Sequence, residues 1–274
     1  MIKIITDSSA NISQAEAMDM GITVIPLTII FGDKEYRDGV DMFEDEFYTR
    51  LVESGEFPHT AQVTEEQLTK AYTEACADGS EVLVLLISKA LSGSYGLACN
   101  IAKRKGFENV HVYNTQCTTV VLRILVDAAV KNRDKPVKEV ISLLNGLRPK
   151  IKLYAALDTL EYLKKGGRLS STAAVIGGLL KIKPVIILNT KGEVELVSKQ
   201  LGMQKALRYI EDEVAADKID KNYPVYYIYT MVDENCRALM EKTGADGGAV
   251  KQNICPVIGA HIGPAAAGIT YVIK

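Results

Sequence analysis

Short apolar runs alternate with amphipathic helical patterns along the first half of the chain, and this alternation is the strongest constraint on its fold. Residues 82–87 (VLVLLI) are apolar throughout, which is typical of a strand buried on both faces. Other strands are predicted over 2–6 and 110–113, and helices over 14–20, 44–53, 65–77, 95–105, 118–131 and 137–147. Because parallel strands need crossover connections, the pattern predicts a mostly parallel sheet flanked by helices.

The rhythm changes after residues 148–150 (RPK), where we expect a domain boundary. Beyond it, residues 189–192 (NTKG) predict a hairpin turn, further helices are inserted, and two or three short strands are expected to finish the chain. A chain of 274 residues is long enough for two modest domains. We therefore expect an α/β protein with two domains. Residues 1–149 form the mostly parallel domain, and residues 150–274 form an α/β domain with a mixed or antiparallel sheet.

Composition excludes several classes of protein. The 32 Lys and Arg residues nearly balance the 34 Asp and Glu residues, which argues against a general nucleic-acid-binding surface. The five cysteines are scattered and form no CxxC pair, so we expect no zinc site and a cytoplasmic, reducing location.

The chain begins with a predicted strand rather than a signal peptide. The most apolar stretch, 257–273, contains His261, glycines and a proline, which argues against a membrane span. Nothing in the sequence demands more than a monomer.

Hydroxyl-bearing residues follow two of the predicted strands. Residues 6–9 (TDSS) follow the first strand, and residues 88–95, which include Ser92, Gly93 and Ser94, follow the VLVLLI run. Ligands of open parallel sheets bind beyond the carboxyl ends of the strands, and the N–H groups at a helix start favour an anion. This segment suits a carboxylate or a phosphate. Ser92 is equally well explained as a helix cap.

Known catalytic templates fit the sequence poorly. No segment matches a P-loop or the GxGxxG fingerprint, and Ser92 stands where a nucleophile elbow around Ser94 would need glycine. A hydrolytic serine also needs a histidine base, and the candidates are His59, His111 and His261. His261 lies among glycines and apolar residues, where a buried imidazole needs a hydrogen-bond partner. Both a structural hydrogen bond and a ligand contact would satisfy it.

Three further segments allow a functional or a purely structural interpretation. Thr60 and Gln62 precede a predicted capping box at Thr64, and they either serve a ligand or belong to an ordinary polar loop. The basic, glycine-rich segment 163–171 either approaches a phosphate or an acidic partner, or simply joins two helices. A helix of small residues is predicted over 172–180, and it either lines a tunnel or packs closely against a neighbour.

Five segments, taken in order across almost the whole chain, resemble the DegV family of bacterial fatty-acid-binding proteins. They are residues 6–10 (TDSSA), 60–62 (TAQ), 91–95 (LSGSY), 162–168 (YLKKGGR) with 181–184 (KIKP), and 259–264 (GAHIGP). Each segment is weak evidence alone, and their ordered combination is specific.

The resemblance implies a protein that is not itself an enzyme and that holds one long-chain fatty acid in a buried apolar tunnel. Much of that tunnel is expected from residues 150–274, with the carboxyl group near the domain junction. No cofactor and no metal are implied. The family's head-group residues correspond to Thr60, Ser92, Gly93, Ser94 and His261.

The resemblance also implies a partner. Similar proteins of Gram-positive bacteria present the acid to a separate fatty acid kinase, which makes acyl phosphate for phospholipid synthesis. On this analogy Arg168 meets the kinase or the phosphoryl group. The chain departs from the family at 199–202 (KQLG), where Lys-x-Arg-Gly is usual, and at 263–265 (GPA), where Gly-Pro-Gly is usual. The first departure removes an arginine linked to kinase docking.

The free energy of burying the acyl chain is large enough that uncharged groups can hold the carboxyl group. Burial of about 15 methylenes at about 0.8 kcal/mol each contributes on the order of 12 kcal/mol before ordering costs, so two hydroxyls suffice to orient the ligand.

Two rival classes of function stay open. One is a phosphotransferase or hydrolase that uses His261 or His59 with Ser92, and the other is a regulatory interaction protein with a vestigial pocket.

Overall fold

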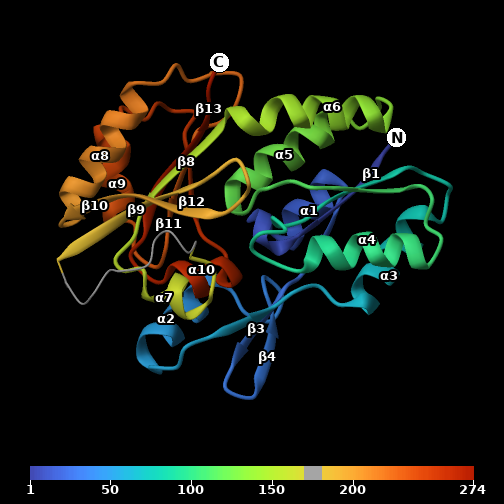
Figure 1. The fold of residues 1–274 in the computed structure, drawn as a ribbon, viewed down its shortest axis with the longest axis horizontal. Helices are drawn as coiled ribbons and strands as arrows, with labels where there is room; N and C mark the ends of the chain where they lie inside the picture. Colours follow the sequence, from blue (N-terminus) through green and yellow to red (C-terminus); the bar gives the residue numbers. More distant parts are fainter. Residues whose placement is uncertain (170–180) are drawn as a thin grey trace.

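Four parallel strands form the sheet of the N-terminal half, in the order β2-β1-β6-β7 (Figure 1). The computed structural model describes residues 1–169 and 181–274. Every residue of β6 is buried, as its continuous apolar sequence predicts. The mostly parallel sheet expected from the alternating pattern is therefore confirmed. The strands are β1 (Lys3–Asp7), β2 (Thr23–Ile25), β6 (Val82–Leu85) and β7 (Val110–Tyr113).

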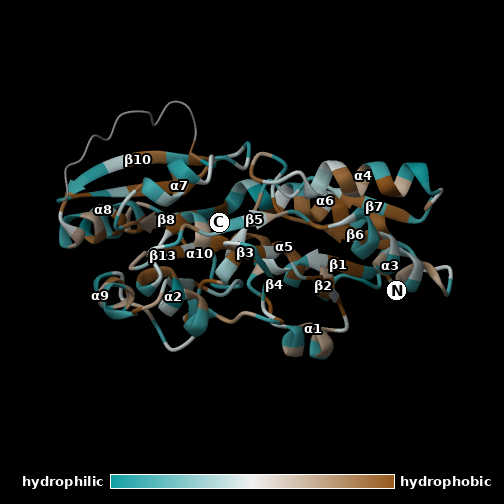
Figure 2. Ribbon diagram, turned by 90° about the horizontal axis from the view of Figure 1, so that it is seen from below, coloured by the Kyte–Doolittle hydropathy of each residue, from teal (hydrophilic) through white to brown (hydrophobic). Residues whose placement is uncertain are grey.

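Helices connect and cover these strands. Capping boxes at Ser13 and Thr64 begin the first and third helices, in which the side chain of each cap accepts a hydrogen bond from the third helical residue. Hydrophobic residues gather along β1, β6 and β7, whereas the surrounding helices mix hydrophobic and hydrophilic residues (Figure 2). The elements are η1 (Ser8–Ala10), α1 (Gln14–Met20), α3 (Glu65–Cys76), α4 (Ser94–Arg104), α5 (Thr119–Lys131) and α6 (Val137–Leu147).

A six-stranded sheet forms the C-terminal half, in the order β10-β9-β8-β13-β11-β12. Its neighbours are antiparallel except for β11 and β12, so the predicted mixed sheet is confirmed. The predicted hairpin turn is also confirmed, because the Gly192 N–H donates to the Asn189 carbonyl at 2.9 Å. The strands are β8 (Ile151–Ala156), β9 (Ile182–Leu188), β10 (Val194–Leu201), β11 (Tyr226–Tyr229), β12 (Val250–Asn253) and β13 (Ala267–Val272).

Two helices, α8 (Met203–Ala215) and α9 (Glu234–Lys242), pack against each other and against this sheet. They bury a core that includes Leu207, Ile210 and Leu239. The short helix α7 (Glu161–Lys165) follows β8. The helix predicted over 172–180 lies outside the described residues. Within the described residues, no helix combines the length and the apolar character needed to cross a membrane.

A third, three-stranded sheet was not predicted from the sequence. It joins β4 (Lys34–Arg37), β3 (Thr28–Phe31) and β5 (His59–Ala61) in antiparallel pairs, and α2 (Glu44–Glu53) connects β4 to β5. The two strands beside β3 are short and carry no hydrophobic alternation, so local pattern cannot distinguish them from a polar loop. The pairing places Thr60 on β5, opposite Ile29, rather than in a loop.

The end of the chain also differs from the prediction. Between β12 and β13, where only short strands were expected, Pro256–Ile262 forms the helix α10. Its first five residues are all buried, so the segment lacks the apolar stripe that marks a surface helix. Pro256 occupies the favourable first helical position. Contacts with α2, α7, β3 and β5 surround this helix and supply its stability.

Arg148, which stands where the domain boundary was predicted, is a buried connection between the two halves. Its guanidinium donates to the Gln116 carbonyl at 2.8 Å and to the Asn189 carbonyl at 2.9 Å. Gly192 completes this contact, because a Cβ atom there would overlap the Gln116 backbone. The β9–β10 hairpin is therefore seated on the loop between β7 and α5. The division into two domains near residue 149 stays a prediction.

Replacing Arg148 by alanine should destabilise the fold by about 2–4 kcal/mol, because two buried carbonyls lose a charged donor. Lys150, which is exposed two residues further along, provides the matched control Lys150→Ala. Equilibrium unfolding in urea should show a clear loss for Arg148→Ala and almost none for the control. Equal stabilities of the two variants would show that this junction does not hold the halves together.

Candidate ligand-binding site

A cavity of about 380 Å³ draws its walls from both halves of the chain. Most of its lining is aliphatic, from residues such as Ile87 after β6, Leu153 on β8, Ile186 on β9, Ile228 on β11 and Ile258 on α10. A smaller polar set completes the wall. A site with this composition fits an amphipathic ligand with a long apolar portion. The polar residues are Thr60, Gln62, Ser92, Thr118, Thr119, Arg168 and His261.

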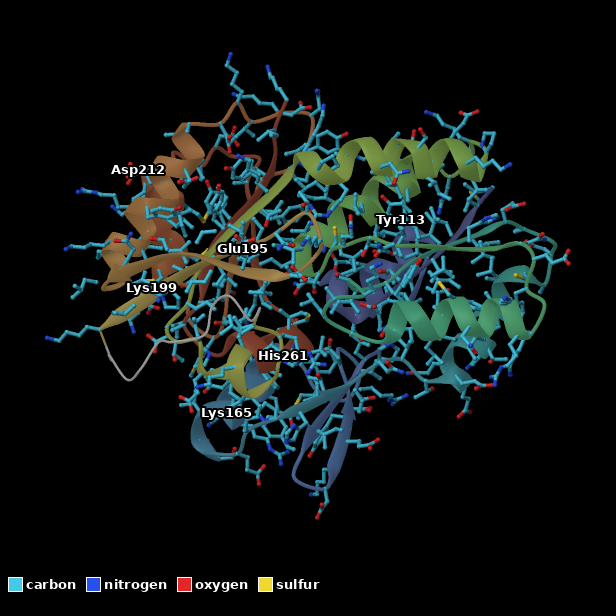
Figure 3. The ribbon with its side chains drawn as sticks, viewed as in Figure 1. Tyr113, Lys165, Glu195, Lys199, Asp212 and His261 are labelled. Carbon is cyan, nitrogen blue, oxygen red and sulfur yellow. The ribbon has the colours of Figure 1, made fainter. Side chains whose placement is uncertain are left out.

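Thr60 and His261 meet at this cavity. The pairing of β5 with β3 positions Thr60, and the last turn of α10 positions His261. The Thr60 Oγ1 lies 2.9 Å from the His261 Nε2, within hydrogen-bond distance. Figure 3 shows His261 where α7 and α10 come together. The hydrogen-bond partner that the sequence required for His261 is therefore Thr60, and both residues line the cavity.

The environment of His261 keeps its imidazole uncharged. Burial, together with the nearby charge of Arg168, lowers the pKa of His261 to about 4. Its Nδ1 is buried and has no hydrogen-bond partner among the described residues. The ring lies close against Gly166, where a Cβ atom would overlap Nδ1. At neutral pH His261 therefore offers a neutral ring that can orient the Thr60 hydroxyl.

Ser92 and Gly93 line the same cavity at the start of α4, whereas Ser94 lies behind them. The Ser92 Oγ lies 3.0 Å from the Ser94 Oγ and accepts the Ser94 N–H at 3.2 Å. Ser92 therefore makes the cap-like contact that the sequence allowed and also faces a potential ligand. A side chain at Gly93 would overlap the carboxamide of Gln62, so this glycine allows Gln62 to approach.

Arg168 carries the one formal charge among the described residues that line the cavity. Its Nε donates to the Leu91 carbonyl at 3.1 Å, and its Nη1 donates to the Gly166 carbonyl at 2.5 Å. These bonds fix the guanidinium beside the segment that holds Ser92. The described lining includes no carboxylate, so the electrostatics favour an anionic group at this end.

Sequence reasoning missed Thr118 and Thr119. Both line the cavity at the start of α5, and both are buried. The sequence showed them only as the beginning of a predicted helix. The one available signal was a pair of adjacent threonines at a strand-to-helix connection, which is the position where the serines at 92 and 94 drew attention.

The catalytic alternative receives no support from the geometry. His59 is exposed, and its ring contacts Phe57. His111 pairs with Glu81, and His261 bonds to Thr60 rather than to a serine. The described residues contain no group of three or more His, Cys, Asp or Glu side chains arranged to hold a metal ion. All five cysteines are free.

The fold and the site define a class of α/β protein in which a mostly aliphatic cavity carries a polar, hydroxyl-bearing end. The chain belongs to the DegV family, because the family model described as "Uncharacterised protein, DegV family" matches residues 1–274. The resemblance inferred from the sequence is thereby confirmed.

Known relatives match this chain over almost their full length. A DegV domain-containing protein of Caldanaerobacter subterraneus subsp. tengcongensis is 32% identical, with 100% of this chain and 99% of the relative covered. A fatty-acid-binding DegV family protein from Thermus thermophilus is 28% identical with a TM-score of 0.88, covering 100% of this chain and 99% of that one. A stearic-acid-binding protein from Eubacterium ventriosum is 26% identical with a TM-score of 0.84, at the same coverage.

The lowered pKa of His261 makes a testable contribution to stability. In the unfolded chain a histidine binds a proton near pH 6.5, whereas folded His261 does so only near pH 4. Between these values the unfolded state binds more protons, so the free energy of unfolding falls as the pH is lowered. Wild type should therefore lose more stability than His261→Gln between pH 6.5 and pH 4.5 in urea unfolding.

The comparison isolates His261, because the buried carboxyls of Asp7 and Asp38 titrate in both proteins. Burial raises the pKa of Asp7 to about 6 and that of Asp38 to about 8, and these effects cancel in the difference. Parallel pH profiles for wild type and His261→Gln would contradict a neutral, buried His261.

Proposed function

We propose that this protein binds one long-chain fatty acid, with the acyl chain along the aliphatic part of the cavity and the carboxyl group at its polar end. The observation that carries the proposal is that Thr60 and Ser92, from separate elements, line one mostly aliphatic cavity. The Thermus thermophilus and Eubacterium ventriosum structures, both described as fatty-acid-binding, share this fold over the whole chain.

The carboxyl group is held mainly by neutral donors in this proposal. The hydroxyls of Thr60 and Ser92 contact the carboxyl group, and His261 orients Thr60. Gly93 leaves room for Gln62 to approach this end of the cavity. Ser94 does not line the cavity, and it positions Ser92 through the contact between their hydroxyls. Burial of each methylene contributes about 0.8 kcal/mol, so the chain supplies the affinity and the hydroxyls determine which end it presents.

We further propose that the bound acid is presented to a separate kinase, in the cytoplasm and by a monomeric protein. A carboxylate held by hydroxyls keeps its lone pairs available, so an oxygen can attack the γ-phosphorus of ATP to give acyl phosphate and ADP. Arg168 lines the cavity and its charge acts on His261, so in this proposal it stabilises the incoming phosphoryl group. At the position of the missing docking arginine, Leu201 is an exposed hydrophobic residue, so this side chain cannot form an ion pair with a partner.

Loss of both hydroxyls should weaken fatty acid binding. Thr60→Val with Ser92→Ala should raise the Kd for stearic acid at least about 10-fold, because two hydrogen bonds to a charged group are removed. Isothermal titration of the delipidated protein measures this effect. The exposed residues Thr73 and Ser142 provide a matched control pair, Thr73→Val with Ser142→Ala, which should bind like wild type. An unchanged Kd in the cavity variant would remove Thr60 and Ser92 from the site.

Arg168 should affect transfer more than binding. Arg168→Gln should leave the Kd for stearic acid within about 3-fold, because neutral groups hold the carboxyl group. In a coupled assay with ATP and a DegV-dependent fatty acid kinase, acyl phosphate formation should fall at least about 10-fold. Lys165→Gln, which changes a nearby exposed cation paired with Glu161, is the control and should retain transfer. Normal transfer by Arg168→Gln would contradict the role given to this residue.

A further inference from the structure

A second polar group, Thr118 and Thr119, lies in the cavity wall on a different element from Thr60 and His261. Thr118 and Thr119 begin α5, which packs against η1, β1, β6 and β8. Thr60 and His261 instead lie on β5 and α10, which pack against each other and against β3. Thr118 and Thr119 therefore come from other elements than Thr60 and His261, although all four residues line the same cavity.

Among the described residues, the hydroxyls of this second group have no hydrogen-bond partner. Thr118 is 8% exposed and Thr119 is 4% exposed, and neither Oγ1 has a hydrogen-bond partner within residues 1–169 and 181–274. Thr118 is the N-cap residue of α5, yet its side chain makes no capping hydrogen bond. A buried hydroxyl without a partner destabilises a protein, and valine would fill the same volume without that penalty.

The backbone at this place is also held in a costly conformation. Thr119 has a φ of 50°, in the left-handed region that β-branched residues rarely adopt. Strained residues of this kind persist where the surrounding structure over-determines them, commonly at ligand sites. Strain and unpartnered hydroxyls therefore coincide at one point of the cavity wall, and an all-hydrocarbon chain would satisfy neither hydroxyl.

We propose that the cavity accommodates a fatty acid whose chain carries a hydroxyl or oxo oxygen along its length, and that Thr118 and Thr119 are its hydrogen-bond partners. The inference rests on the proposed fatty acid binding and adds the class of acid. A threonine hydroxyl both donates and accepts, so it can pair with either oxygen function. Rotation about the Cα–Cβ bond moves the hydroxyl to another staggered position, which in this proposal turns the oxygen towards the ligand. The N-terminal end of α5 adds a partial positive charge that favours an oxygen lone pair.

The test compares stearic acid with 10-hydroxystearic, 12-hydroxystearic and 10-oxostearic acids, by isothermal titration of the delipidated full chain. Wild type should bind at least one oxygenated acid no more weakly than stearic acid. In Thr118→Val with Thr119→Val, the Kd for that acid should rise about 5- to 10-fold, the effect of a lost hydrogen bond, while the Kd for stearic acid changes less than about 2-fold.

Thr270 supplies the matched control. Its hydroxyl is also buried and unpartnered among the described residues, but it lies on β13 and does not line the cavity. Thr270→Val should leave the ratio of the two Kd values unchanged. The single variant Thr118→Val, at a position with extended backbone, repeats the test if the double variant does not fold.

The possible outcomes separate the two proposals. If wild type binds stearic acid but binds every oxygenated acid more weakly, the inference is wrong and the proposed function stands. The same conclusion follows if the threonine variants leave the ratio unchanged. If no acid binds at all, the proposed function fails, and this inference fails with it.

Discussion

The contact between Thr60 and His261 determines the character of the polar end of the cavity. It joins β5 to α10, elements that are 201 positions apart in the sequence. Burial keeps His261 neutral, and the glycine at 166 lets the ring approach closely. Because the ring is uncharged, Arg168 alone contributes formal charge to the described wall. The polar end therefore combines neutral donors with one cation, an arrangement that agrees with the proposed presentation of a carboxylate.

The aliphatic part of the cavity imposes a second constraint. Protein interiors are normally packed without voids, and a mostly aliphatic cavity of about 380 Å³ leaves its lining without the contacts of a filled core. Arg148 ties the β9–β10 hairpin to the loop before α5, and these elements carry part of the cavity wall. A bound acyl chain would supply the missing contacts, so the proposed ligand also stabilises the fold.

Local signals in the sequence predicted most of the elements, and long-range contacts account for what was missed. The helices at 14–20, 44–53 and 137–147 begin and end where they were expected, because caps, prolines and apolar spacing act within a few residues. Helix α10 and the pairing of β5 with β3 depend on partners that are distant in the sequence, so these segments carry little local pattern. The resemblance to the DegV family drew attention to Thr60, Ser92 and His261. A role in ligand binding can be recognised for Thr118 and Thr119 only once the residues of the cavity wall are known.

The most direct measurement of the central claim is the identity of whatever the protein carries. Protein purified without added lipid should be extracted with organic solvent, and the extract should be analysed by mass spectrometry against an extract of the Arg148→Ala variant and a buffer blank. The account predicts close to one fatty acid per wild-type chain. Wild-type protein that carries no fatty acid, and whose thermal stability does not rise when long-chain acids are added, would contradict it.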